Sequence, residues 1–150
     1  MIPSTSQSLF ERLGGEEKVR AIVDAFIDRV FADRMIGFFF RDADRMRIKE
    51  FEFQLAAKFL GADIEYQGRP LHLAHSKHPI MGGHFARRRQ ILKETLQAYD
   101  VPAFIQEAWL KHTDSLRPLI TPEADSDCDP IAARQSSSWV SNRHFSGAKE

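Results

Sequence analysis

Apolar residues recur at the spacing of an α-helix in several long segments of this chain, and no segment alternates apolar and polar residues as a half-buried strand does. The clearest helix is predicted from Glu16 to about Phe31, because two acidic residues suit the positive end of a helix dipole and an apolar stripe follows. The stripe consists of Val19, Ile22, Val23, Phe26, Ile27 and Val30. We therefore expect an all-α protein.

Three further long helices and one short one are predicted from the same periodicity. Their approximate ranges are 9–13, 44–60, 84–99 and 103–119. The 44–60 helix carries one apolar stripe through Ile48 and Phe51 and a second through Met46 and Phe53, so we expect it to be apolar on two sides.

The connections between these helices are marked by glycine, proline and aspartate. Gly14 and Gly15 predict a tight hinge after the short helix, and Gly82-Gly83 predicts a break before the 84–99 helix. Asp100 is a candidate N-cap for the helix that follows Pro102. The segment 37–40 has no helical period, and we expect it to form a buried corner.

Charge and composition exclude several classes of protein. Lysine plus arginine and aspartate plus glutamate each total 21, so the formal net charge is zero and neither nucleic acid nor an anionic membrane is expected as a partner. The N-terminus lacks a secretory signal, and Cys128 is the only cysteine, so we expect a soluble cytoplasmic protein without an intramolecular disulfide.

Because the apolar period stops after Thr121, we expect one domain over 1–121 and a weakly ordered tail over 122–150.

His75 is the residue with the most informative surroundings. It lies on a short apolar segment that ends at Pro79, between two aromatic-rich helical regions, and the chain contains 12 phenylalanines. Haem requires one neutral imidazole held beneath the iron and a wide apolar slot for a flat macrocycle. This setting therefore suits an axial haem ligand, although a histidine by itself is more often unliganded.

The order and spacing of several short motifs resemble the truncated haemoglobins, most closely their group I. The motifs are Leu9-Phe10 with Gly14-Gly15, Val30 to Asp33 leading to Phe39-Phe40, Leu60-Gly61, Tyr66 to Gly68, Ala74-His75 with Ile80, His84-Phe85, and Val101-Pro102. The resemblance implies a two-over-two helical sandwich, a shortened globin with haem b between its layers. It also implies reversible binding of oxygen, nitric oxide or carbon monoxide by a protein that is not a dedicated enzyme. Nitric oxide dioxygenation is expected as a side activity, after which a reductase would restore the ferrous iron.

The resemblance also assigns roles to single residues. His75 is expected to be the proximal iron ligand, Phe40 to pack on the porphyrin near the ligand side, and Phe85 to be a further haem contact. The face of the 44–60 helix that carries Ile48 and Glu52 is expected to point toward the haem.

The ligand side departs from the family pattern. The position where group I members commonly place a hydrogen-bonding tyrosine is occupied by Ile27, and the position of a distal glutamine is occupied by Glu52. A buried carboxylate needs a proton or a cation, and Arg88 is the candidate cation on the 84–99 helix. We hypothesise a pair of Glu52 and Arg88 near the ligand site; the alternative is that both side chains reach solvent. Without a tyrosine, we expect faster autoxidation than in tyrosine-bearing relatives.

Three other interpretations remain open at this point. The chain could be a haem-free globin-fold sensor or interaction module, or a haem peroxidase-like enzyme in which Glu52 and Arg88 act on the O–O bond. A zinc site formed by His72, His75 and His78 is a weaker alternative, because no thiolate or carboxylate stands close enough in the sequence to complete it.

Overall fold

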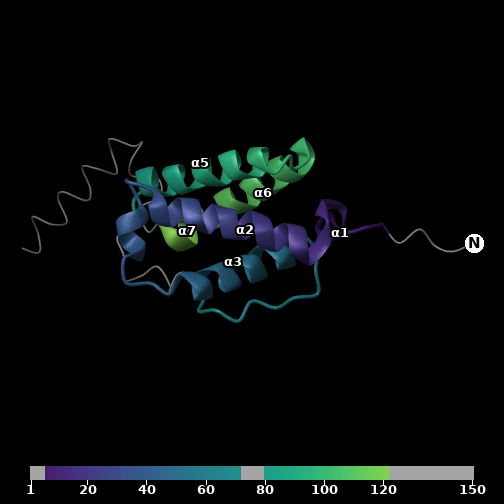
Figure 1. Ribbon diagram of the computed structural model, residues 1–150, viewed down its shortest axis with the longest axis horizontal. Coiled ribbons are helices and arrows are strands. Elements are labelled where there is room, and N and C mark those ends of the chain that lie inside the picture. Colours follow the sequence, from purple (N-terminus) through teal and green to yellow (C-terminus); the bar gives the residue numbers. More distant parts are fainter. Residues whose placement is uncertain (1–5, 72–79, 122–150) are drawn as a thin grey trace, which may run out of the picture.

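The computed structural model describes residues 6–71 and 80–121, and in these ranges it contains helices and no strand (Figure 1). The elements are α1 (Leu9–Leu13), α2 (Gly15–Ala32), the 3-10 helix η1 (Gly37–Phe40), α3 (Arg45–Phe59), α5 (Gly82–Ala98), α6 (Ala103–Ser115) and α7 (Arg117–Ile120). The all-α prediction is confirmed. The segment with His72, His75 and His78 and the expected tail at 122–150 lie outside the described residues.

Helix α2 lies at the centre of the fold, and both of its long neighbours pack on it. It packs against α3 on one side and α5 on the other, and α5 in turn packs on α6 (Figure 1). Its predicted apolar stripe is buried throughout: Val19, Ile22 and Val30 are 0% exposed. This arrangement is the expected two-over-two helical sandwich, stabilised by burial of apolar area between the layers.

The start of the chain folds as the sequence predicts. Ser8 caps α1 by accepting a hydrogen bond from the backbone N–H of Glu11, whose side chain accepts one from the backbone N–H of Ser8. Gly14 and Gly15 then adopt φ values of 116° and 75°, which only glycine adopts readily. The glycine pair is therefore the hinge between α1 and α2.

Charged residues hold the outer side of α3 against α2. Lys49 Nζ lies 2.6 Å from Asp24 Oδ1 and 2.9 Å from Asp28 Oδ1, and Arg20 Nη1 lies 2.7 Å from Glu50 Oε2. The Arg20–Glu50 pair is exposed and contributes little stability, whereas the Lys49 side chain is only 14% exposed. The buried Phe53, Ala56 and Ala57 fix how α3 packs on the core, and Ile48 and Glu52 line the space between the layers.

Two apolar segments are less buried than predicted. Segment 37–40 is a 3-10 helix with no buried residue, and Phe38 is 51% exposed, because one tight turn points its side chains in several directions rather than into one core. Met46 is 71% exposed, so the first turn of α3 is not apolar on two sides.

Three predicted helix boundaries are wrong. Gly82 and Gly83 belong to α5 rather than breaking the chain before it. Asp100 does not cap α6; it adopts a φ of 52° to turn the chain, and the Pro102 carbonyl accepts the hydrogen bonds of the first turn of α6. The last predicted helix ends at Ser115 and is followed by α7, where Leu119 is 46% exposed.

Gly37 is required by the corner between α2 and η1. A Cβ atom at this position would lie 2.6 Å from the backbone oxygen of Phe31, which cannot move aside cheaply. We expect Gly37→Ala to lower the free energy of unfolding by about 1–3 kcal/mol, measured by urea denaturation. Gly83→Ala is the matched control, because nothing lies within 4 Å of its added Cβ; an equal loss in both variants would contradict this reason.

Among the described residues, no helix has both the length and the apolar character needed to cross a membrane.

Candidate functional site

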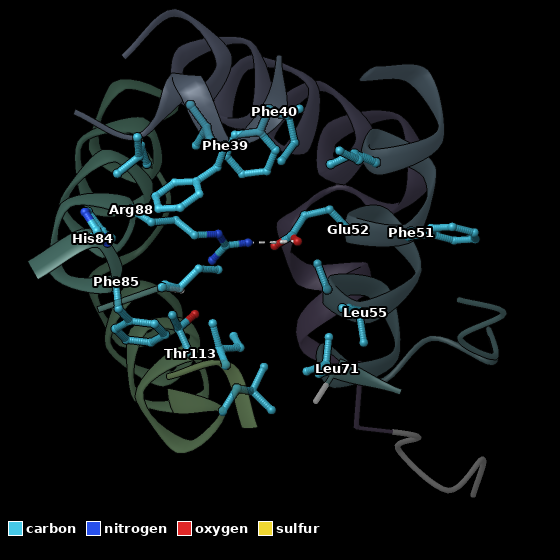
Figure 2. Close-up of a pocket in the computed structure, with 18 of the residues that line it drawn as sticks. Phe39, Phe40, Phe51, Glu52, Leu55, Leu71, His84, Phe85, Arg88 and Thr113 are labelled. Atoms are coloured by element: carbon cyan, nitrogen blue, oxygen red, sulfur yellow. Dashed lines mark ion pairs between the residues drawn. The ribbon is translucent and has the colours of Figure 1, made fainter. Parts of the chain in front are cut away.

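A cavity of about 340 Å³ lies between α3 on one side and α5 and α6 on the other, with η1 at one end (Figure 2). Its volume falls in the range of small-molecule and cofactor sites. Most of its wall is apolar, with Leu55 from α3, Phe39 from η1 and Trp109 from α6 among the lining residues. The residues present therefore fit a mainly apolar group of cofactor size.

The structure brings together six of the seven predicted site residues. Those that line the cavity are Ile27 of α2, Ile48 and Glu52 of α3, Phe40 of η1, and Phe85 and Arg88 of α5. Ile27 and Phe85 are buried at 2% and 3% exposure, while Phe40 stacks on Phe31 with ring centroids 5.1 Å apart. The seventh residue, His75, lies outside the described residues.

Glu52 and Arg88 form an ion pair across the cavity, here called the cavity ion pair. Arg88 Nη2 lies 2.9 Å from Glu52 Oε2, and the two side chains are 24% and 19% exposed, respectively. Figure 2 shows the pair reaching from α3 on one wall to α5 on the other. The pairing expected from the sequence is confirmed, and the alternative of two separate solvated side chains is wrong.

The position of Arg88 is supported by an aromatic ring as well as by the carboxylate. Its guanidinium carbon lies 4.8 Å from the centroid of the Phe26 ring in α2. A planar guanidinium offers five N–H donors in a fixed fork and stays charged at any ordinary pH. Arg88 can therefore present an N–H to a small polar molecule in the cavity while keeping its bond to Glu52.

Two further ionisable side chains line the cavity and respond to the charge of Glu52. Burial lowers the pKa of His112 on α6, and the Glu52 carboxylate partly opposes this effect. Burial, and then the Glu52 carboxylate, raise the pKa of Tyr66, whose hydroxyl donates to the Arg69 carbonyl at 2.8 Å. The charge of Glu52 thus raises the pKa values of two other side chains that line the cavity.

His84 lies at the edge of the cavity near η1. Its Nδ1 accepts a hydrogen bond from the backbone N–H of Met81 at 3.1 Å, and its ring meets the Phe39 ring edge-on at 4.9 Å. Because Nδ1 is an acceptor, the proton of the neutral ring is on Nε2. In this arrangement the Nε2–H of His84 is the atom that could donate a hydrogen bond to a group in the cavity.

The sequence assigned no role to His112 or Tyr66, although both line the cavity. His112 stacks on Phe59 of α3 with ring centroids 4.1 Å apart and an angle of 7° between the planes. It follows Ile105 and Trp109 at helical spacing, so the periodicity could have placed it on the inner face of α6. Within 6–71 and 80–121, no three His, Cys, Asp or Glu side chains gather as they would around a bare metal ion.

The lowered pKa of His112 predicts a loss of stability in mild acid. We expect the free energy of unfolding to fall as the pH drops below the ordinary histidine value of about 6.5, because the unfolded chain then binds a proton that folded His112 resists. The loss stops growing below the pKa of the folded state, where both states are protonated. Urea denaturation across this pH range should show a shallower dependence for His112→Gln, and an unchanged dependence would contradict the assignment.

Comparisons with known proteins agree with this geometry. A family model described as bacterial-like globin matches residues 8–121. Group 1 truncated hemoglobin GlbN of Mycolicibacterium paratuberculosis is 31% identical over 96 residues, 64% of this chain and 71% of that protein. The protein of the same name from Synechocystis is 32% identical over 99 residues, 63% of this chain and 80% of that protein.

Solved structures show the same similarity. The crystal structure of truncated hemoglobin from Tetrahymena pyriformis in its Fe(III) form has a TM-score of 0.72 with this chain at 25% identity, covering 77% of this chain and 98% of the other. The family model spans the whole sandwich from α1 to α7. The chain therefore belongs to the bacterial-like globin family, among relatives that are group 1 truncated haemoglobins, and this membership implies haem-based gas binding.

Proposed function

We propose that the cavity binds haem b, with His75 as the iron ligand, and that the protein reversibly binds oxygen or another diatomic gas. The observation that carries this proposal is the cavity itself, an apolar slot between the two layers with Phe40 and Phe85 on its wall. When bound, the haem iron supplies an open coordination position for a diatomic molecule.

The side chains of this chain have distinct tasks in the proposed site. Phe40, Phe85 and Leu55 line the cavity, where they would contact the macrocycle and exclude water from it. Arg88 donates an N–H to a polar gas ligand, and Glu52 holds the guanidinium in position at 2.9 Å. Ile27 offers no hydrogen bond, so Arg88 takes over the donor task that the family resemblance gives to a tyrosine.

The finer assignments follow from this site. Oxygen is the proposed ligand, with nitric oxide and carbon monoxide as further ligands, and nitric oxide dioxygenation is a proposed side activity that needs a reductase to restore ferrous iron. If Arg88 did not supply this hydrogen bond, the absence of a hydroxyl at Ile27 would give faster autoxidation than in relatives with a tyrosine there. The single cysteine, Cys128, suits a reducing compartment, and we propose a cytoplasmic location.

An absorption spectrum of the purified protein tests the proposal. We expect a Soret band in the oxidised protein, a shift on reduction, and a further shift with carbon monoxide. A protein that stays colourless after addition of hemin would contradict haem binding and favour a haem-free sensor or interaction module.

Peroxide reduction is a second candidate function, favoured by the cavity ion pair. A carboxylate and a guanidinium beside one another can move a proton and stabilise developing negative charge when an O–O bond breaks. We would expect Glu52→Gln to retain haem and lose peroxide turnover if this were the main activity. Turnover equal to that of the unaltered protein would exclude an acid–base role for Glu52.

A further inference from the structure

Asp33 connects three parts of the chain near the end of the cavity where η1 lies. It follows α2 directly, and its Oδ1 atom accepts hydrogen bonds from the backbone N–H groups of Met35 at 2.9 Å and Ile36 at 3.2 Å. Its Oδ2 atom accepts from Arg87 of α5, with Nη2 at 2.8 Å and Nε at 2.9 Å. One carboxylate therefore fixes the turn that starts segment 33–40, here called the corner segment, and also ties this segment to α5.

The pair of Asp33 and Arg87, here called the corner pair, is well shielded from solvent on its acidic side. The Asp33 side chain is 8% exposed and the Arg87 side chain 36%. The Arg87 guanidinium, helped by the two backbone N–H groups, holds the pKa of Asp33 below its usual range although burial opposes this, so Asp33 is a carboxylate at neutral pH. Hydrogen bonds between charged partners are about twice as strong as neutral ones. The corner pair is therefore a strong connection between two separate elements.

The corner pair lies beside the part of the cavity wall where η1 meets the first turns of α5. His84 stands three residues before Arg87, so their side chains are neighbours on one face of α5. The His84 ring meets the Phe39 ring edge-on at 4.9 Å, and both residues line the cavity (Figure 2). Because η1 packs on α2, its position against α5 depends on side-chain contacts such as these two.

We propose that the corner pair is a latch that retains haem in the cavity, with Asp33 as a positioning residue. The inference rests on the proposed haem site. A cofactor leaves a cavity faster when part of the wall can open locally. The corner pair holds the corner segment against α5 and thereby keeps Phe39 against His84. Without the pair, this end of the wall opens more often and haem is lost faster.

The corner pair and the cavity ion pair have separate tasks. Arg87 and Arg88 are neighbours in α5, but Arg87 reaches the corner segment while Arg88 reaches Glu52 across the cavity. Neither Asp33 nor Arg87 is among the described residues that line the cavity. We therefore expect loss of the corner pair to shorten the time for which haem stays bound and to leave the donor that Arg88 offers to a gas ligand unchanged.

Haem transfer tests the inference. Ferric, haem-loaded protein is mixed with an excess of apomyoglobin, and the Soret change gives the rate at which haem dissociates. Asp33→Asn keeps an oxygen for the backbone N–H groups of Met35 and Ile36, but its NH2 group cannot accept from Arg87. We expect about tenfold faster haem loss, because a bond between charged groups is removed. An unchanged rate would overturn the inference and leave the haem site intact, whereas a protein without a Soret band would overturn both.

Arg87→Gln removes the same pair from its more exposed side. It should accelerate haem loss by a similar factor, and it keeps the inference testable if Asp33→Asn fails to fold. If both residues act through one pair, the double variant should lose haem no faster than either single variant. Factors that multiply in the double variant would show two independent effects and contradict a single latch.

Two control variants separate the latch from a general loss of stability. Asp114→Asn removes another aspartate–arginine pair from α5, at 2.7 Å, but this pair connects α5 to α6. Ile105→Val deletes a methyl group from a fully buried side chain that is not among the described residues lining the cavity. Both controls should keep the haem dissociation rate of the unaltered protein. Acceleration in either control equal to that of Asp33→Asn would contradict the assignment to the corner pair.

The stretching frequency of bound carbon monoxide distinguishes the two pairs. It should be the same in Asp33→Asn, Arg87→Gln and the unaltered protein, because the cavity ion pair stays in place. A shifted frequency in both variants would show that the corner pair acts on the ligand side, and would overturn its assignment as a latch for haem.

Discussion

Replacing His75 with alanine is expected to abolish the Soret band and to remove the stability that haem confers. The imidazole is the proposed bond between the protein and the iron, and a methyl group cannot replace it. A ligand present at about a thousand times its Kd stabilises the folded state by about 4 kcal/mol, so a loss of that order is expected. Absorption spectra and urea denaturation in the presence of hemin measure the two effects.

The neighbouring histidines are the matched controls. His72 and His78 lie three residues before and after His75, and their alanine variants should retain the Soret band. If the His75→Ala protein kept an unaltered spectrum, the iron ligand would have to be sought elsewhere. His112 would be the first candidate, because it lines the cavity and burial favours its neutral form.

Replacing Arg88 with leucine is expected to accelerate oxygen dissociation by about ten- to a hundredfold. A hydrogen bond from a charged donor contributes about 1.5–3 kcal/mol, and each 1.4 kcal/mol changes a rate or equilibrium by about tenfold. The variant also leaves Glu52 unpaired in the cavity, so the free energy of unfolding should fall by about 1–3 kcal/mol, less than for a fully buried pair. Stopped-flow oxygen dissociation and urea denaturation provide the two measurements.

The next residue of the same helix provides the control. Arg89 pairs with Asp114 at 2.7 Å, where the side chains are 35% and 47% exposed, so Arg89→Leu should leave oxygen dissociation unchanged. The stretching frequency of bound carbon monoxide gives an independent reading of the charge near the ligand. If Arg88→Leu and Glu52→Gln both left this frequency and the oxygen dissociation rate unchanged, the cavity ion pair would have no part in ligand chemistry.

Much of the fold could be predicted from the sequence, because helices depend on local periodicity. The apolar stripe of α2 and the glycine hinge before it were both predicted, since each rests on residues within a few positions of one another. The wrong predictions concern residues whose local sequence pattern does not match their environment in the folded protein. Met46 has the spacing of a core residue but lies in the first turn of α3, where it is exposed to solvent. Asp100 is a residue type common at helix N-caps, but here it adopts a positive φ in a turn.

In the candidate site, too, some residues could be predicted from the sequence and others could not. Family resemblance placed Phe40, Phe85 and Glu52 around one haem, and the structure shows that all three line one cavity. His112 was missed because a histidine at helical spacing has the same pattern whether it faces a cavity or a neighbouring helix.

By itself, the sequence determined which segments are helical and which face of each is apolar, because backbone hydrogen bonds and side-chain periodicity act over one or two turns. Only the tertiary structure decided that Glu52 and Arg88 meet at 2.9 Å rather than reaching solvent separately. Their distance depends on how α3 and α5 each pack on α2, and that packing depends on the volumes of side chains far apart in the chain.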